Sequence, residues 1–257
     1  MRIGTYNVLG LTGYPPEEAV GTIGKPGEDS NSDHFARVFT QLSCDILALQ
    51  EGVQVRTMQQ IVRQMDRYLA TFPSPKSWPG HILSRYPILE SRTFSHVDPK
   101  EGTPPFSRTS GAALLAIDSD TTLWVVDVHL HPSDIDLRIL ESNILQEHIE
   151  KIQSVTSNII VLGDFNSKVD ERVHQNLKAM NFVNAMEAVG GGLQATMDTV
   201  GIRRNYLDHI YASPSLSPNL QSATVMRDSG FRHDGPQETG VYVHSDHLPV
   251  VVQLTWP

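Results

Sequence analysis

Apolar residues recur along the chain in short runs that turn-forming residues interrupt, which is the pattern of β-strands. Nine such runs are either continuously apolar or alternate between polar and apolar positions: 2–9, 45–50, 80–84, 111–118, 122–129, 158–163, 206–211, 220–226 and 248–255. We expect each run to form a strand, so strands are spread over the whole length of the chain.

Helical periodicity is clearest between Ser133 and about Val155. Apolar residues recur there at steps of three and four: Ile135, Ile139, Leu140, Ile144, Leu145, Ile149 and Ile152. Ser133, which follows Pro132, is the predicted N-cap of this helix. The apolar stripe predicts that the helix lies on a sheet.

Three shorter helices are expected at 33–43, 54–66 and 169–180, with Asp33 and Asp170 as N-caps. Helices thus separate runs of consecutive strands, an order typical of a layered α/β domain rather than of a βαβ repeat. No linker or internal repeat divides the chain, so we expect residues 1–257 to form a single domain. Four polar stretches rich in Gly and Pro lack periodicity and are expected to be long functional loops: 10–32, 97–110, 184–205 and 227–245.

Composition and charge narrow the class of protein. Hydrophobic residues make up 39% and charged residues 19%, and no window approaches the ~18 uninterrupted apolar residues of a membrane span, so membrane insertion is not expected. The N-terminus lacks the pattern of a secretory leader and Cys44 is the single cysteine, which together favour a cytoplasmic location. The net charge of −9 is opposite to the basic footprint of proteins that bind nucleic acid through its phosphates.

Polar side chains stand at the ends of six of the expected strands. A lone Asp or Asn in such a place is more often a turn former or a helix cap, but the recurrence at six ends favours one shared site at a sheet edge. Converging carboxylate, amide and imidazole groups indicate a site for a hard divalent metal ion. The residues are Asn7, Glu51, His129, Asp164, Asn166, Asp208, Asp246 and His247.

Read in order, these strand ends resemble the endonuclease/exonuclease/phosphatase superfamily of DNase I-like, metal-dependent phosphoesterases. The matching blocks are Tyr6-Asn7, Leu49-Gln50-Glu51, His129-Leu130, Gly163-Asp164-Phe165-Asn166, Leu207-Asp208-His209-Ile210 and Ser245-Asp246-His247. They cover nearly the whole chain. The resemblance implies a four-layered α/β/β/α sandwich, in which two mainly antiparallel sheets pack face to face and the site lies at one end.

The expected cofactor is Mg²⁺ or Mn²⁺. Glu51 is the best candidate ligand, because Mg²⁺ prefers oxygen donors and uses one or two protein carboxylates. The resemblance implies that Asn7 and Asp246 serve the ion directly or through water. It also implies that a second ion binds near Asp164 and Asn166 in some members, so one or two ions are expected.

The catalytic roles follow from the needs of phosphoester hydrolysis, which are alignment of water and relief of charge. Asp164 is expected to orient or deprotonate the water, and Asn166 to donate an amide hydrogen bond to a phosphoryl oxygen. His247 and Asp208 resemble the family's His–Asp pair, in which the carboxylate fixes the tautomer and favours the charged imidazole. His129 is the second imidazole of catalytic type.

Outside these blocks, Arg108 is a candidate for binding substrate phosphate, because some family members have an Arg near this point and a guanidinium fork suits a phosphate. The alternative is a solvated loop cation. His131, His209 and His244 have no motif role and are expected to be structural or peripheral. The glycine-rich segment 21–27 lacks the ending of a P-loop and is interpreted as a flexible flap.

The leading hypothesis for function is hydrolysis of a phosphoester, as a phosphomonoesterase or phosphodiesterase, on a small-molecule or head-group-like substrate. A DNA or RNA nuclease of the same superfamily is the main alternative, although the acidic chain and the lack of a basic stripe do not favour nucleic acid. A non-catalytic binding module is a remote alternative, because no motif block is missing. Nothing in the sequence points to an obligate protein partner.

Overall fold

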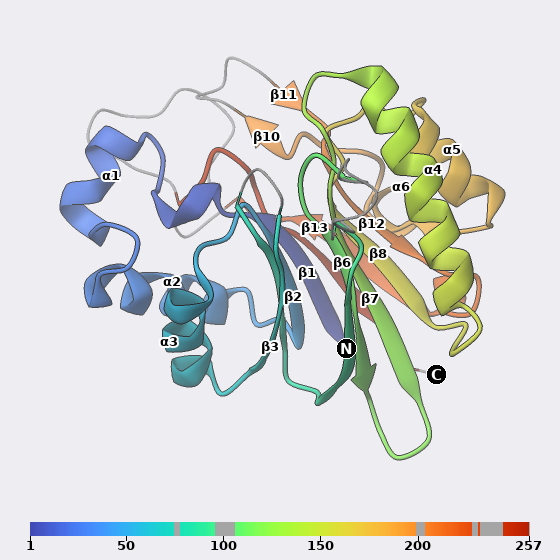
Figure 1. Cartoon of the computed structure of the whole chain (residues 1–257), viewed down its shortest axis with the longest axis horizontal. Helices are drawn as coiled ribbons and strands as arrows, with labels where there is room; N and C mark the ends of the chain where they lie inside the picture. The colour runs from blue at the N-terminus through green and yellow to red at the C-terminus, as the bar shows by residue number, and fades with distance from the viewer. Residues whose placement is uncertain (75–77, 96–105, 199–203, 228–230, 232–243, 257) are drawn as a thin grey trace, which may run out of the picture.

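Two six-stranded sheets packed face to face form the centre of the molecule (Figure 1). The first has the strand order β13 (Leu220–Val225), β14 (Val250–Leu254), β1 (Arg2–Asn7), β2 (Ile46–Gln50), β4 (Gly80–Ser84) and β3 (Tyr68–Phe72). The second has the order β5 (Ile88–Thr93), β6 (Ser110–Ala116), β7 (Thr122–His129), β8 (Ile159–Asp164), β12 (Asp208–Ala212) and β9 (Val183–Asn184). The computed structural model describes residues 1–74, 78–95, 106–198, 204–227, 231 and 244–256.

Each sheet contains one parallel pair, β1 with β2 in the first and β7 with β8 in the second. The other pairings of described strands within these sheets are antiparallel. A small hairpin of β10 (Met197–Asp198) and β11 (Arg204–Asn205) lies apart from the two sheets. The mainly antiparallel character expected from the sequence is therefore confirmed.

Helices cover both outer faces of the paired sheets (Figure 1). One side carries α1 (Pro16–Ile23), α2 (Asp29–Gln41) and α3 (Val55–Met65), and the other carries α4 (Ile135–Ile152) and α5 (Arg172–Ala179). The short α6 (Ala185–Val189) packs against β12 and β13. The four-layered α/β/β/α sandwich is thus confirmed. Among the described residues, no helix is both long enough and apolar enough to cross a membrane.

Strand β7 shows why a nearly continuous apolar run belongs here. Trp124 and Val126 pack toward the layer of α4, while Val125 packs into the cluster between the two sheets. Because side chains alternate along a strand, Asp127 and His129 share the inner face with Val125. Both faces of β7 are buried, and its last residue, His129, lies on the inner face at the end of the sandwich.

The strand register aligns site residues from the second sheet. His129 and Asp164 are partners across β7 and β8, and Asp164 and Asp208 are partners across β8 and β12. Gly163 permits this approach, because its φ is 139° and a Cβ there would overlap the carbonyl oxygen of Val128. The glycine of the Gly-Asp-Phe-Asn block is therefore a packing requirement.

Besides the two-residue strands β9, β10 and β11, two longer strands were not predicted from the hydrophobic pattern, because they are edge strands. β3 and β5 end their sheets, and much of each is in contact with solvent. Leu89 is exposed, whereas the polar residues Glu90 and Arg92 pair with each other beside it. Without one fully buried face, neither strand shows the expected alternation.

The ends of several helices differ from the sequence-based predictions. Asp134, not Ser133, caps α4 and accepts a hydrogen bond from the backbone nitrogen of Leu137. The helix α2 begins four residues before Asp33, so that residue lies inside it, and Glu171 rather than Asp170 directly precedes α5. Capping side chains are common near helix starts, and the sequence alone does not tell which of two neighbours adopts the extended cap conformation.

The predicted loops are only partly loops. The stretch 10–32 contains α1 and the start of α2, so the flap expected at 21–27 is wrong for its first residues, which belong to α1. Pro16 at the first helical position, with Glu17 and Glu18 in the first turn, are the start signals that the glycine nearby obscured. Most of 97–110 and 227–245 lies outside the described residues.

Candidate active site

Asp164 is the point where the polar strand ends of the two sheets meet. Its Oδ2 accepts a hydrogen bond from Asn7 Nδ2 at 3.0 Å, which joins β8 of one sheet to β1 of the other. The same oxygen lies 3.6 Å from Nε2 of His129 and 3.8 Å from Nε2 of His247. Burial raises the pKa of Asp164, against the opposing effect of the His247 charge. Three other chain segments thus converge on this buried carboxylate.

His247 and Asp208 form a close pair. His247 Nδ1 lies 2.8 Å from Asp208 Oδ2, and Ser245 holds the backbone of His247. The Ser245 hydroxyl donates to the carbonyl oxygen of Asn7 at 2.7 Å and accepts from the backbone nitrogen of His247 at 3.2 Å. This explains the serine of the Ser-Asp-His block, because one hydroxyl ties the loop to the end of β1.

The pair fixes the charge of His247. Burial disfavours the charged imidazole, but the carboxylates of Asp208 and Asp164 outweigh it and raise the pKa of His247 to about 10. His247 is therefore a cation at neutral pH. His129 behaves oppositely, because burial lowers its pKa to about 4 and leaves the ring neutral.

Glu51 directly follows β2 in a left-handed backbone conformation, with φ of 51°. Such a conformation is rare for a glutamate and marks a position that the surrounding structure imposes. Its Oε1 lies 3.7 Å from His129 Nε2 and 3.9 Å from Arg108 Nη1, both too long for a hydrogen bond. Burial raises the pKa of Glu51 to about 7, with the opposing charge of His247 as the next largest influence.

The donor groups around Glu51 fit a divalent cation. A largely buried carboxylate without a close cationic partner gains from a bound cation, which offsets the cost of burying its charge. Asn7 lies beside it, with an amide oxygen that accepts from the backbone nitrogen of Leu9 at 3.2 Å, and the partly exposed Asp246 lies next to His247 and Tyr6. All of these donors are oxygens, as Mg²⁺ prefers.

A second group of candidate ligands lies deeper. Asp164, Asp208 and His247 each offer one atom, and these atoms lie within 4.8 Å of one another. Asp208 Oδ1 is buried and has no hydrogen-bond partner among the described residues. Asp208 can therefore offer Oδ1 to a cation while its Oδ2 keeps the contact with His247.

Asn166 also has a left-handed backbone, with φ of 46°. Its backbone nitrogen donates to Asp164 Oδ1 at 2.9 Å. Its side-chain nitrogen faces the carbonyl oxygen of Leu130 at 3.1 Å and Asp164 Oδ2 at 3.4 Å. The amide therefore ties the turn after β8 to the end of β7, and its expected donation to a phosphoryl oxygen stays a prediction.

Three other histidines contact the protein itself. His131 Nδ1 accepts from the backbone nitrogen of Asp134 at 2.9 Å, at the start of α4. His209 is buried and its Nε2 lies 2.9 Å from the carbonyl oxygen of Tyr206. His244 lies 3.2 Å from a ring nitrogen of His34. All three hold local structure beside the site.

A fully buried carboxyl group below the site had no predicted role. Asp127 Oδ1 accepts from Gln50 Nε2 at 2.7 Å, and Gln50 Oε1 accepts from the hydroxyl of Thr5 at 3.2 Å. This network joins the two sheets next to Glu51 and His129. Asp127 Oδ2 has no hydrogen-bond partner among the described residues, and burial raises the pKa of Asp127 well above its usual value. The signal in the sequence is a single carboxyl inside the run Val125-Val126-Asp127-Val128.

The buried Asp127 predicts a stability that falls with rising pH. The unfolded chain loses this proton near pH 4, whereas the folded protein keeps it, so the free energy of unfolding decreases as pH rises above 4. Asp127→Asn keeps a neutral group of the same shape. At pH 7 the free energy of unfolding of this variant is expected to exceed that of the wild type by about 1 kcal/mol or more. Urea unfolding at pH 5 and pH 7 measures this, with the exposed Asp120→Asn as the control. If the free energy of unfolding of Asp127→Asn were below that of the wild type by the same amount at both pH values, Asp127 would not be protonated in the folded protein.

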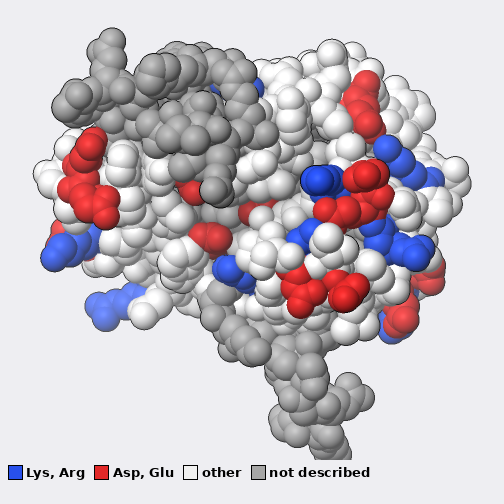
Figure 2. Space-filling model, turned by 90° about the horizontal axis from the view of Figure 1, so that it is seen from above, with Lys and Arg blue, Asp and Glu red and all other residues white. Residues whose placement is uncertain are grey.

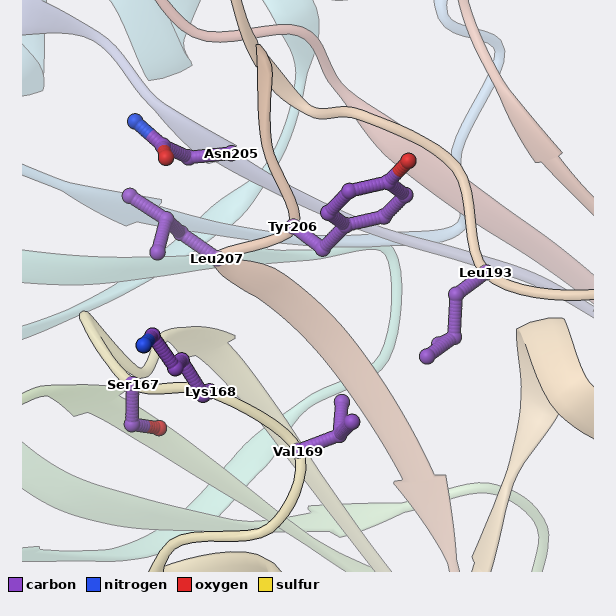
Figure 3. Close-up of a pocket in the computed structure, with 7 residues that line it drawn as sticks. All are labelled: Ser167, Lys168, Val169, Leu193, Asn205, Tyr206 and Leu207. Atoms are coloured by element: carbon purple, nitrogen blue, oxygen red, sulfur yellow. The ribbon is translucent and has the colours of Figure 1, made fainter. Parts of the chain in front are cut away.

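An apolar pocket of about 580 Å³ is lined by Ser167, the residue after Asn166, and by Leu207, the residue before Asp208 (Figure 3). In the close-up, Val169, Leu193 and Tyr206 come from three segments and surround one hollow. Tyr206 is 45% exposed, unusual for an aromatic ring, and this leaves one wall of the pocket open to a ligand. The lining residues are Ser167, Lys168, Val169, Leu193, Asn205, Tyr206 and Leu207.

Solved structures share this fold over the full chain. A mannosyl-6-phosphatase from Bacteroides thetaiotaomicron is 15% identical, with 100% of each chain covered and a TM-score of 0.75. The 3′ phosphatase NExo from Neisseria, bound to a product DNA hairpin, is 19% identical, with 100% of each chain covered and a TM-score of 0.71. Truncated TDP2 from Caenorhabditis elegans is 18% identical, with a TM-score of 0.70. The match covers 98% of this chain and 96% of the TDP2 chain. At these identities the likeness extends to the fold alone.

No curated protein matches the chain in sequence. A family model does, and it spans residues 4–228, which include the ends of β1, β2, β7 and β8 and the start of β12. Members of this family are hydrolases that act on phosphoesters. The converging strand ends, the paired sheets and the matching family model together establish that this chain belongs to the endonuclease/exonuclease/phosphatase family.

Proposed function

We propose that the protein is a metal-dependent phosphoric ester hydrolase that acts on a compact substrate, a phosphomonoester or phosphodiester with a small organic or head-group-like part. One observation carries the proposal: Asp164 Oδ2 lies within 3.8 Å of side-chain nitrogens of Asn7, His129 and His247. A carboxylate, an amide, a neutral imidazole and a charged imidazole around one point supply the acceptors and donors that in-line attack of water requires.

In this proposal Asp164 accepts a proton from the attacking water. Its raised pKa brings it closer to the working pH and makes it a better base than an exposed carboxylate. Asn7 donates to Oδ2 and keeps this oxygen directed at the centre of the site. His129, neutral at working pH, lines the same side and presents an imidazole nitrogen to the water or to the phosphate.

The remaining side chains stabilise negative charge. His247, held as a cation by Asp208, donates to a phosphoryl oxygen as charge develops on it, and Asn166 adds an amide donor. Arg108, close to Glu51 at the mouth of the site, binds the phosphate as a guanidinium fork. Asn7, Glu51 and Asp246 would hold a divalent cation, Mg²⁺ or Mn²⁺. Its positive charge would offset the negative charge of the phosphate and of the nearby carboxylates. A second ion near Asp164 and Asn166 belongs to the same proposal.

A compact substrate is favoured by two features beside the site. The apolar pocket lined by Leu193, Tyr206 and Leu207 offers a place for the organic part of the ester. On the described part of the face seen from above, basic and acidic side chains are interspersed and form no continuous basic stripe (Figure 2). A protein that tracks a polyanion needs such a stripe.

Nuclease activity remains the second candidate, and one observation favours it: the similar fold of the Neisseria 3′ phosphatase was solved with a product DNA hairpin. A non-catalytic binding module has less support, because all eight strand-end residues are present and converge. A cytoplasmic location stays a prediction.

A substrate panel tests the proposal. The protein is assayed with Mg²⁺ and with Mn²⁺ on an aryl phosphate monoester, an aryl phosphodiester, sphingomyelin, inositol phosphates, plasmid DNA and abasic-site DNA. We expect the highest kcat/KM on one of the compact esters and little change between ~50 and ~200 mM salt, whereas activity on DNA that falls steeply over this range would favour the nuclease. Absence of turnover on every ester would contradict the proposal.

The pocket gives this panel an internal control. Tyr206→Ala is expected to raise KM roughly 10-fold for substrates with an aromatic or apolar group and to leave KM for a small sugar phosphate unchanged, because hydrophobic pocket contacts have about this effect. The matched control is Tyr68→Ala, since Tyr68 is similarly exposed but lies on the edge strand β3. If Tyr206→Ala changed KM equally for all substrates, the pocket would not bind the organic part of the substrate.

A further inference from the structure

Two charged side chains are buried on the helix face where the sequence predicted only apolar residues. Arg138 is 6% exposed and Glu141 is fully buried, one turn apart in the first half of α4. Ile135 and Leu140, expected in the buried stripe, are 56% and 50% exposed. The second half of the helix follows the expectation, with Leu145, Ile149 and Ile152 buried. A buried charge is costly unless it is fully paired, so its partners identify its role.

Glu141 accepts three hydrogen bonds from two segments next to the site. Its Oε1 accepts from the backbone nitrogen of Ser107 at 2.7 Å and from the hydroxyl of the same residue at 2.6 Å. Its Oε2 accepts from the backbone nitrogen of His131 at 2.9 Å. Ser107 directly precedes Arg108, and His131 lies two residues beyond His129.

Arg138 extends this arrangement to a third segment. Its Nη1 donates to the carbonyl oxygen of His131 at 3.0 Å, so the peptide groups on both sides of that residue are held by α4. Its Nε and Nη2 lie 2.9 and 2.7 Å from Glu171 Oε2, and Glu171 Oε1 accepts from the backbone nitrogen of Lys168 at 2.9 Å. Lys168 is two residues beyond Asn166.

We propose that Glu141, supported by Arg138, is a positioning residue that fixes the phosphate-binding edge of the active site through Ser107. The inference rests on the proposed function, in which Arg108 binds phosphate. Arg108 has no hydrogen bond of its own among the described residues and contacts Glu51 only at 3.9 Å. The orientation of its guanidinium therefore depends on the backbone that carries it, and Glu141 holds that backbone at the preceding residue. Thr109, on the other side, accepts from the backbone nitrogen of His129 at 2.8 Å, which couples the same loop to β7.

The carboxylate at position 141 satisfies all three donors at once, because one oxygen accepts from Ser107 and the other accepts from His131. The contact that the proposal uses is the one to Ser107. Glutamine retains one oxygen for Ser107 but presents N–H groups to the backbone nitrogen of His131. Glu141→Gln is therefore expected to keep the Ser107 contact, whereas Glu141→Ala loses both.

The experiment combines these variants with Arg108→Ala and measures two quantities, kcat/KM on the best substrate and the dissociation constant of inorganic phosphate by calorimetry with Mg²⁺ present. Glu141→Ala is expected to lower kcat/KM and weaken phosphate binding by roughly 10- to 100-fold, as is typical of residues that orient a binding group. In the Arg108→Ala background the same substitution is expected to have less than a roughly threefold effect, since coupled residues are not additive. Glu141→Gln is expected to bind phosphate within roughly threefold of the wild type. The control is Glu147→Ala, exposed on the same helix and expected to change neither quantity.

Full additivity of Glu141→Ala and Arg108→Ala, or unchanged phosphate binding in Glu141→Ala, would overturn the inference. Thermal melting of each variant accompanies these measurements, and if Glu141→Ala does not fold, Ser107→Gly in the same double-mutant scheme decides between the outcomes. A wild type that binds phosphate but hydrolyses no ester would defeat the proposed function alone, because the phosphate-binding measurement still tests Glu141.

Discussion

Replacing Asp164 by asparagine is expected to lower kcat/KM by roughly 1000-fold or more while the protein remains folded. The amide removes the base that accepts the proton of water, which is typically worth about 10²- to 10⁴-fold. It also presents N–H groups or an uncharged oxygen where Asn7 donates and where His247 carries its positive charge. The loss therefore includes both proton transfer and the alignment of the surrounding donors.

Folding is not expected to suffer equally. Asp164 is fully buried and burial raises its pKa, so its charge costs stability in the folded protein and the neutral amide relieves this cost. Steady-state kinetics and thermal melting of Asp164→Asn measure the two effects separately. The matched control is Asp170→Asn, six residues along and exposed, which should retain wild-type activity. Activity within tenfold of the wild type in Asp164→Asn would remove Asp164 from the centre of the mechanism.

Removal of divalent cations is expected to abolish turnover, and their return to restore it. Glu51, Asp164, Asp208 and Asp246 bring four carboxylates close together in a chain whose net charge is −9. The cationic His247 balances part of this charge, and a bound ion offsets the remainder. Dialysis against a chelator, followed by titration with Mg²⁺ and Mn²⁺, checks the activity directly.

The same ion should stabilise the fold. At a concentration 100 times its dissociation constant, a ligand that binds only the folded state adds about 2.7 kcal/mol, which corresponds to a rise in Tm of roughly 5–10 °C for a protein of this size. Glu51→Gln is expected to reduce this rise strongly, because it removes the charge of the principal ligand. The exposed Glu150→Gln is the control and should keep the full rise. No change in Tm at millimolar ion in the wild type would count against the metal site.

Most strands were predictable because their sequence pattern records burial. β7 is buried on both faces and was predicted at its observed bounds, as was β4. β3 and β5 were not, because edge strands face solvent and lose the alternation that marks a strand. α4 was predicted, and so was the buried face of its second half, but in its first half Arg138 and Glu141 take the buried places expected for Ile135 and Leu140.

The sequence alone determined the order of the elements and the polar residues that end the strands, because hydrophobic periodicity and motif order are local properties of a chain. Only the tertiary structure decided which polar groups meet. The Asn7 contact with Asp164 spans the two sheets, the Gln50 contact with Asp127 lies beneath it, and Glu141 reaches Ser107 across 34 residues of sequence. Burial and charge pairing set the raised pKa of His247 and the lowered pKa of His129, and both depend on neighbours that are distant along the chain.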